Sequence, residues 1–307
     1  RRSSDLFGIF EYSNFNLREL LPFLDWSPFF HAWELKGVFP AILDHPKFGE
    51  RARELHADAL ALLERLLESG ALRAAGALAF WPANSVGDDV ELYADESRSR
   101  LAGRFHFLRR QEDREDGKPQ WCLADFVAPR DSGRLDSLAG FVVTAGLGAG
   151  EEAARLAAAN DDYSAILVKS LADRLAEAFA EWIHRRAREL RGFGAAEPLT
   201  LEDLLRENYR GVRPAAGYPA SPDHTEKRTL FALLDAEARA GVRLTESCAM
   251  APAASVCGLI LHHPDSLYFD VGRLARDQVE DYARRKGQSI EETERWLAPN
   301  LGYDPGA

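Results

Sequence analysis

The sequence predicts an α+β fold, in which one antiparallel sheet packs against helices within a single domain. Short apolar runs separated by turn residues fill residues 75–145, and their connections are too short for the crossover helices that parallel strands require. Helical periodicity dominates the rest of the 307 residues. No repeat or low-complexity linker divides the chain, so we predict one domain.

The first half of the chain supplies the predicted sheet. Residues 1–46 are rich in aromatic side chains and prolines, and are predicted to be coil with short turns. Residues 47–68 place leucines at three- and four-residue spacings before Ser69-Gly70, which predicts a helix. Strands are then predicted at residues 75–81, 90–94, 102–108, 120–127 and 139–145.

The second half is predicted to be mainly helical. The longest helix, residues 164–191, carries an apolar stripe that includes Leu171 and Phe179. Shorter helices are predicted at residues 151–159, 202–208, 223–240, 277–286 and 291–296.

Composition excludes several classes of function. The chain is 46% apolar and 10% aromatic, which is typical of a globular protein, and no stretch approaches the length of a membrane span. Its 38 Lys and Arg residues against 49 Asp and Glu argue against nucleic acid, because phosphate backbones attract cationic surfaces. Three cysteines are too few for a disulfide framework and favour a cytoplasmic location.

The start of the chain suggests that the protein continues elsewhere. Met250 is the only methionine, so Arg1 is not a translation start, and no signal peptide pattern opens the chain. We therefore expect a piece of a longer polypeptide, whose chemistry needs parts that lie outside these residues.

A glycine run offers a possible nucleotide site. Gly146-Leu-Gly-Ala-Gly150 lies between a predicted strand and a predicted helix, where nucleotide-binding turns occur. A Rossmann fold would need a second strand that ends in an acidic residue about 20 positions later. Asp161-Asp162 and the start of the long helix occupy that place, so we interpret the glycines as a strand-to-helix turn.

Metal and nucleophile motifs are weak. Cys248, Cys257, His262 and His263 lie close in sequence but lack the spacing of zinc ligands, so no metal site is predicted. No GxSxG motif occurs and no His lies beside a Ser or Cys in a catalytic pattern, so no catalytic residue is predicted.

One face of the long helix is charged at every fourth residue. Two interpretations remain open: a solvated salt-bridge ladder, and a carboxylate cluster that a cationic ligand or a partner would relieve. The residues of this face are Lys169, Asp173, Glu177, Glu181 and Arg185.

The most unusual segment is Arg213-Pro-Ala-Ala-Gly-Tyr-Pro-Ala-Ser-Pro-Asp-His-Thr-Glu-Lys227. Its prolines stiffen the backbone, while Ala215 and Gly217 leave it bare. Such a loop can offer backbone groups to a small polar ligand, with Arg213 clamping a carboxylate. The alternative is a well-formed helix start, with Ser221 as N-cap and Arg213 tied to Glu207 or another helix carboxylate.

This segment resembles the signature of the activation domains of cobalamin-dependent methionine synthases. The likeness continues in order over nearly the whole chain. The other segments that carry it include Asp25-Trp-Ser-Pro-Phe-Phe30, Phe80-Trp-Pro-Ala-Asn84, Cys122-Leu-Ala-Asp-Phe-Val-Ala-Pro129, Leu244-Thr-Glu-Ser247, His263-Pro-Asp-Ser266 and Trp296-Leu-Ala-Pro-Asn-Leu-Gly-Tyr303.

The resemblance implies a single C-shaped domain over residues 1–307, with a twisted antiparallel sheet unlike a Rossmann fold, and residues 1–20 as an extension from a cobalamin-binding module. It implies a reactivation role, in which the domain binds S-adenosylmethionine and presents the methyl group to oxidised cob(II)alamin, held by that module. Flavodoxin or an equivalent reductase would supply the electron. Zinc is expected only in a homocysteine domain outside this chain, and the fragment is not expected to turn over alone.

The resemblance also implies a set of ligand contacts. Residues that match Asp173 and Tyr218 lie near the corrin when modules dock. Phe269 and Ser221 depart from the family, which often has Tyr and Cys there. Arg213 suits the ligand carboxylate, while Asp25 and Glu177 suit its ammonium or ribose, without a choice between them. The predicted contacts are Asp25, Glu177, Arg213, Ala215, Gly217, Tyr218, Tyr268 and Phe269.

Two other functions remain as alternatives. One is a free-standing S-adenosylmethionine-dependent methyltransferase, which the missing βαβ unit disfavours. The other is a docking module for the cobalamin-binding and flavodoxin domains that binds no cofactor itself.

Overall fold

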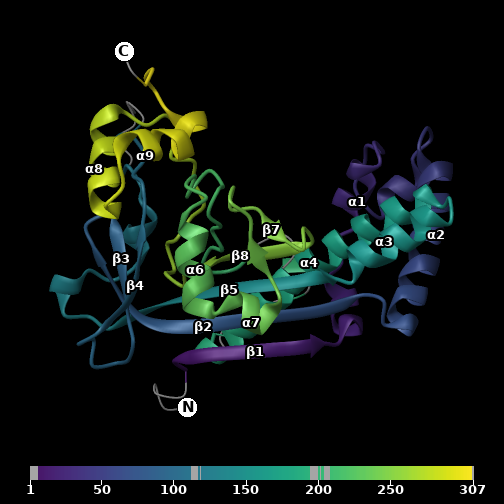
Figure 1. The fold of residues 1–307 in the computed structure, drawn as a ribbon, viewed down its shortest axis with the longest axis horizontal. Coiled ribbons are helices and arrows are strands. Elements are labelled where there is room, and N and C mark those ends of the chain that lie inside the picture. The colour runs from purple at the N-terminus through teal and green to yellow at the C-terminus, as the bar shows by residue number, and fades with distance from the viewer. Residues whose placement is uncertain are drawn as a thin grey trace.

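The computed structural model describes residues 6–111, 117, 119–193, 200, 202–203 and 208–305. Its centre is an antiparallel sheet in the order β4-β3-β2-β5-β8, with β1 paired to the same side of β2 as β3 (Figure 1). The strands are β1 (Gly8–Phe15), β2 (Arg73–Val86), β3 (Asp89–Tyr93), β4 (Leu101–His106), β5 (Asp136–Leu147) and β8 (Ser255–Ile260).

Strand β2 organises the sheet. Its first half pairs with β1, its last residues pair with β3, and β5 runs along its opposite edge. Alternate side chains of β2 therefore enter two cores on opposite faces of the sheet. Leu78 and Phe80 belong to the first core, and Ala77 and Ala79 to the second. Strand β8 pairs with β5 at the end of the sheet, so its outer edge is open to other segments.

Helices cover both faces. The first core is closed by α1 (Ser27–Ala32), α2 (Gly49–Ser69) and α4 (Asp162–Arg191), with α3 (Ala149–Ala158) packed on α4. The second core is closed by α6 (Glu226–Leu234), α7 (Ala236–Ala240), α8 (Arg276–Lys286) and α9 (Ile290–Leu297). The small elements are β6 (Arg243–Leu244), β7 (Met250–Ala251) and the 3-10 turns η2 (Leu17–Phe23), η3 (Ala41–Asp44), η4 (Leu123–Phe126), η5 (Arg130–Ser132) and η6 (Ala298–Asn300).

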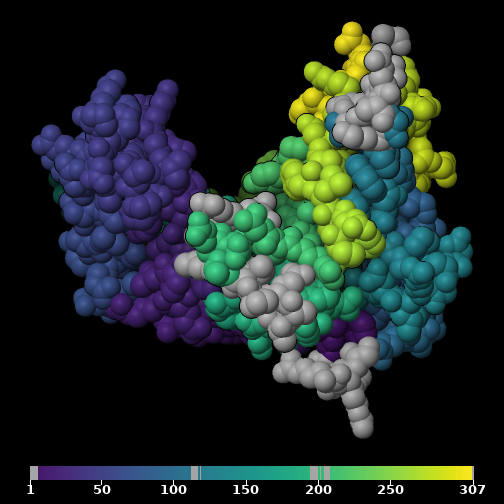
Figure 2. Space-filling view, turned by 180° about the vertical axis from the view of Figure 1, so that it is seen from behind, coloured from purple at the N-terminus to yellow at the C-terminus, as the bar shows by residue number. Residues whose placement is uncertain are grey.

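The molecule has the predicted C shape. Helices α1, α2 and α3 rise at one end of the long strands, and α8 and α9 rise at the other. Figure 2 shows the hollow between the N-terminal residues, in purple, and the C-terminal residues, in yellow. Between the two ends lie β8 and α6.

The α+β class, the antiparallel sheet and the main helices are confirmed, but several local predictions are wrong. Residues 8–15 form β1 rather than coil, because their aromatic side chains pack against the first core. Residues 120–127 contain η4 rather than a strand. The helix predicted over residues 223–240 is divided at Asp235, whose φ is 50°. The helix predicted at residues 202–208 lies largely outside the described residues.

The glycine run forms a turn between β5 and α3, as predicted. Gly148 is the N-cap of α3 with a φ of 91°, and a side chain there would collide with the carbonyl oxygen of Ala71. Across the described ranges, no helix combines the length and apolar character needed to cross a bilayer. The three cysteines are free and buried.

Candidate functional site

A cavity of about 490 Å³ opens at the edge of β8, where α4, the segment from Arg213 and the start of α6 converge. It combines acidic, basic, aromatic and small side chains. The lining residues are Glu177, Arg213, Ala215, Gly217, Tyr218, His224, Lys227, Met250, Ser255, Val256, Cys257 and Tyr268.

The segment from Val212 first extends the sheet and then leaves it. Val212 and Leu261 exchange two backbone hydrogen bonds of 3.0 and 3.1 Å, and the backbone N–H of Leu259 donates to the Pro214 carbonyl over 2.9 Å. Proline has no N–H, so the ladder cannot continue beyond this point. The chain turns away after Pro214, and the gap it leaves beside β8 becomes part of the cavity.

Gly217 shapes the turn that follows. Its φ is 92°, and a side chain at this position would overlap the ring of His224. Its N–H donates to the carbonyl of Ser221 over 2.7 Å, and the N–H of Ser221 donates to the carbonyl of Tyr218 over 2.8 Å. The closed turn presents Tyr218, which is 59% exposed, at the rim of the cavity.

The predicted helix start is wrong in detail. Helix α6 begins at Glu226, several residues after Ser221, and Ser221 does not cap it. Asp223 instead accepts hydrogen bonds from the backbone N–H and the hydroxyl of Thr225, each of 2.8 Å. Pro219 lies within the compact turn and Pro222 follows it, and neither proline begins a helix.

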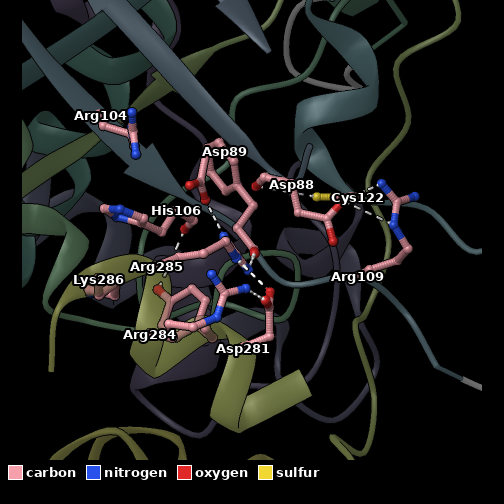
Figure 3. Close-up of polar contacts among 12 residues, drawn as sticks. Asp88, Asp89, Arg104, His106, Arg109, Cys122, Asp281, Arg284, Arg285 and Lys286 are labelled. Atoms are coloured by element: carbon pink, nitrogen blue, oxygen red, sulfur yellow. Dashed lines mark hydrogen bonds and ion pairs between the residues drawn. The ribbon is translucent and has the colours of Figure 1, made fainter. Parts of the chain in front are cut away.

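Helix α8 holds the start of α6 in place through buried polar contacts. The Lys286 ammonium lies 2.5 Å from Asp223 Oδ2 and 2.7 Å from Glu226 Oε1, and all three side chains are buried. The Tyr282 hydroxyl donates to Asp223 Oδ2 over 2.9 Å. Figure 3 shows the neighbouring Arg285 between two carboxylates, those of Asp89 and Asp281.

Arg213 is held from the side of α4. Its Nη2 pairs with Glu181, and its Nη1 donates to the Ala180 carbonyl over 3.2 Å and lies 3.5 Å from His184 Nδ1. Among the described residues, the guanidinium Nε has no protein acceptor. The interpretation of Glu181 as a solvated ladder residue is wrong, because its side chain is only 15% exposed. The tie between Arg213 and a helix carboxylate is therefore present.

Glu177 lies one turn before Glu181 and faces the cavity. In the described part of the chain its carboxylate makes no hydrogen bond or ion pair. Glu177 is an exposed residue, but the protein atoms packed around its carboxyl desolvate it and raise its pKa, and the charges of Arg174 and Arg213 oppose the shift only in part. Burial also raises the pKa of Asp173, a further turn away, which is exposed and outside the cavity lining.

Six of the eight predicted contacts come together in the cavity. Asp25 and Phe269 do not. Asp25 precedes α1 and is exposed, and its Oδ1 accepts the Ser27 N–H over 2.9 Å. Phe269 is 5% exposed and packs in the second core, whereas its neighbour Tyr268 is 49% exposed and lines the cavity.

Half of the lining residues were not predicted from the sequence. Ser255, Val256 and Cys257 belong to β8, a strand that was not predicted. His224 and Lys227 stand inside the signature segment but were assigned to a helix start. A basic residue in the first turn of a helix, where the helix dipole disfavours it, is a signal that would have singled out Lys227. Nowhere in the described ranges do three His, Cys, Asp or Glu side chains gather as metal ligands do.

Comparison with known proteins agrees with this architecture. The family described as "Vitamin B12 dependent methionine synthase, activation domain" matches residues 16–287. The crystal structure of the MetH reactivation domain bound to AdoHcy is 49% identical, with a TM-score of 0.95, and the match covers 98% of this chain and 92% of that chain. The matched residues include the first core and every residue of the cavity lining, while the second core extends beyond them to Leu297 and Leu301. The chain belongs to the family of vitamin B12 dependent methionine synthase activation domains.

Proposed function

We propose that the cavity binds S-adenosylmethionine and that the domain presents its methyl group to cob(II)alamin during reductive reactivation. One observation carries the proposal: the cavity brings together six residues that the family resemblance had assigned to the ligand. The related reactivation domain bound to AdoHcy, the demethylated form of the same compound, supports this choice of ligand.

The charges of the cavity suit the amino-acid end of the ligand. Arg213 keeps its Nε–H free while both Nη atoms are held by α4, so a carboxylate can add to a guanidinium that is already oriented. Glu177 is a carboxylate without a partner among the described residues, and the ligand ammonium would supply one. Asp25, just before α1, remains a predicted contact outside the cavity, and Phe269 can contribute only through its backbone or its packing.

The rim suits transfer of the methyl group to a docked module. Tyr218 and Tyr268 are exposed at the mouth of the cavity, and Asp173 is exposed on α4. Cobalamin, which the neighbouring module of the same polypeptide would bring, supplies the cobalt that accepts the methyl group. The domain would act by positioning, so it needs no general base. Flavodoxin or an equivalent reductase would deliver the electron, and zinc would belong to the absent homocysteine domain.

Calorimetric titration with S-adenosylmethionine and AdoHcy tests the binding step. We expect one site for each compound. Absence of heat with both would favour the docking module that binds no cofactor. Conversion of homocysteine by this chain alone would contradict its role as a fragment that cannot turn over, and methylation of a separate small substrate would favour a free-standing methyltransferase.

Reactivation itself is tested by mixing the chain with a cobalamin-binding module in the cob(II)alamin state and a reductant. We expect the visible spectrum to change to that of methylcobalamin only when S-adenosylmethionine is present. A conversion that proceeds equally without this chain would contradict the proposal.

A further inference from the structure

Lys227 is a buried cation in the cavity wall. Its side chain lines the cavity, and the residue is only 7% exposed. Its ammonium lies 3.0 Å from His224 Nδ1 and donates to the Cys248 carbonyl over 3.2 Å. Burial lowers the pKa of His224 and the charge of Lys227 lowers it further, so the imidazole stays neutral at pH 7 and can accept this hydrogen bond. An ammonium has three donors, and the third has no acceptor among the described residues.

The nearby carboxylates are committed elsewhere. Asp223 Oδ1 accepts a hydrogen bond from Thr225, and Asp223 Oδ2 accepts from Tyr282 and Lys286. Glu226 directs Oε1 to Lys286 and accepts the His106 backbone N–H on Oε2. Within the described part of the chain, no carboxylate therefore lies within ion-pair distance of Lys227.

The position of Lys227 in α6 adds to the cost. It is the second residue of the helix, where the helix dipole disfavours a positive charge. Buried charges are normally paired, and a local conflict of this kind is typical of a functional position. Arg213, the other cation of the cavity, is already paired with Glu181.

Lys227 and Arg213 contact the cavity from opposite faces of the sheet. Arg213 and Glu177 are anchored on α4, which packs on the first core, whereas Lys227 belongs to α6, which packs on the second. A ligand whose carboxylate meets Arg213 would therefore extend its nucleoside half across the edge of β8 toward Lys227. The side chains near that end, Met250 and Cys257 of the lining, suit the apolar faces of a purine.

The backbone at this end is also open. Leu259 and Leu261 direct their N–H groups away from β5 to the segment from Val212, and Cys257 has the same orientation because strand residues alternate. Among the described residues no backbone group pairs with the N–H or C=O of Cys257. A purine presents both donors and acceptors to such an edge.

We propose that Lys227 is a ligand-binding residue, which donates a hydrogen bond to an acceptor on the nucleoside half: a purine ring nitrogen or a ribose oxygen. This inference rests on the proposed function, because it takes the ligand to be an S-adenosyl compound with its carboxylate at Arg213.

The test is calorimetric titration of wild type and Lys227→Met with AdoHcy, with thermal melts to verify folding. Lys36→Met, which removes an exposed lysine, serves as the matched control. We expect Lys227→Met to weaken binding about ten- to a hundredfold, because a charged donor is lost, and Lys36→Met to bind as wild type. Failure of the wild type to bind AdoHcy contradicts the proposed function, whereas equal binding by wild type and Lys227→Met contradicts only this inference.

Ligand analogues identify the partner atom. AdoHcy analogues that each lack one ring nitrogen or one ribose hydroxyl are titrated into both proteins. We expect one analogue to lose affinity for wild type but none for Lys227→Met. The loss caused by the substitution should persist with methylthioadenosine, which has no amino-acid half. Equal losses for every analogue in both proteins, or a loss that disappears with methylthioadenosine, would overturn the proposal.

If Lys227→Met does not fold, Lys227→Arg replaces it, because a planar and longer donor keeps the charge but moves the N–H groups. We then expect a changed rank order of the analogues. An unchanged rank order with unchanged affinity would overturn the assignment.

Discussion

At the scale of single residues, Arg213 combines a structural tie to Glu181 with a place in the cavity wall. Its Nη atoms contact Glu181, Ala180 and His184, while its Nε has no acceptor among the described residues. The sequence left a ligand clamp and a structural tie as alternatives, and the geometry is compatible with both at once. The second oxygen of Glu181 is buried without a partner in the described residues, so the Glu181 carboxylate depends on Arg213 for its compensation.

Replacement of Arg213 should therefore affect binding and stability together. Arg213→Ala is expected to weaken S-adenosylmethionine binding by about 2–4 kcal/mol, because a charge-assisted contact is lost. It should also lower the melting temperature without ligand, because the carboxylate of Glu181 stays buried and unpaired. Arg213→Lys should recover only part of the affinity, since an ammonium lacks the planar fork. Calorimetry and thermal melts measure both effects, and normal affinity in Arg213→Ala would remove Arg213 from the proposed site.

Glu177 should make ligand binding depend on pH. Burial raises its pKa above the ordinary value of 4.5, so the folded, ligand-free protein takes up this proton more readily than the unfolded chain does. The ionised group therefore lowers stability increasingly as the pH rises through this window. If the carboxylate binds the ligand ammonium, affinity should fall as the pH drops through the raised pKa.

Calorimetric titrations at pH values from about 4 to about 8, the range in which carboxylates and histidines change charge, check this dependence. Glu177→Gln should bind more weakly at pH 7 and lose most of the acid-side decrease in affinity. Asp173→Asn is the matched control, because Asp173 also has a raised pKa but lies outside the cavity. If the decrease in affinity persisted in Glu177→Gln and disappeared in Asp173→Asn, the group responsible would be Asp173 and not Glu177.

At the scale of elements, the cavity depends on the turn after Pro214, on the edge strand β8, and on helix α8, which anchors the start of α6 next to the turn. The turn could be predicted because prolines fix φ and glycine permits the positive φ that a tight turn requires. Strand β8 could not, because Gly258 interrupts its apolar run and, with five of its six residues buried, the strand shows no alternation of exposed and buried positions. Residues 120–127 have the apolar character of a strand, yet Asp125 binds the Cys122 N–H and closes a 3-10 turn instead.

The turn should tolerate no side chain at Gly217. Gly217→Ala adds a methyl group that overlaps the His224 ring, in addition to the strain of a positive φ of 92°. We expect a loss of stability of more than about 1 kcal/mol, and weaker ligand binding because His224 supports Lys227. Gly70→Ala is the control, since Gly70 has a φ of 68° but open space around it. Equal melting temperatures and equal affinities for the two variants would show that the contact with His224 has no effect.

Helix α8 should stabilise the turn to an extent that depends on pH. Lys286 lowers the pKa of Asp223 although burial raises it, so this carboxylate contributes stability that is lost only as the pH falls through the depressed value. Lys286→Met leaves two buried carboxylates without their ammonium, which should cost about 3 kcal/mol or more at pH 7. Without Lys286, burial raises the pKa of Asp223, so the variant should regain stability as the pH falls and this carboxylate takes up a proton, whereas wild type loses stability there. The difference in stability between the two proteins, followed by circular dichroism, should therefore shrink toward acid pH, and a difference that stays constant with pH would mean that Asp223 is not stabilised by Lys286.

At the scale of the whole molecule, the C shape arises because β2 and β5 are long and have separate groups of helices packed at their two ends. β2 and β5 are long enough to carry α1, α2 and α3 at one end and α8 and α9 at the other (Figure 1). The sequence predicted the sheet and its helices from periodicity, and the shape from resemblance. It could not predict that the two faces meet at the edge of β8, because that arrangement depends on which strand ends the sheet. The origin of residues 1–20 as an extension of a preceding module stays a prediction, although residues 8–15 are built into the sheet.

Docking of this domain on cobalamin should depend on Asp173 more than ligand binding does. Asp173 is exposed on α4 outside the cavity lining, and burial by neighbouring atoms raises its pKa, so a cationic or hydrogen-bonding group on a docked module would stabilise its ionised form. Asp173→Asn removes the charge while it keeps the shape. In the full-length enzyme we expect unchanged affinity for S-adenosylmethionine, but a shifted equilibrium between conformers in which cobalamin keeps its protein ligand and those ready for reactivation. Visible spectra over temperature and cobalt oxidation state report that equilibrium. Asp162→Asn, an exposed carboxylate in the first turn of the same helix, should leave the spectra unchanged. Identical spectra for Asp173→Asn and wild type under all conditions would return Asp173 to the solvated ladder of α4.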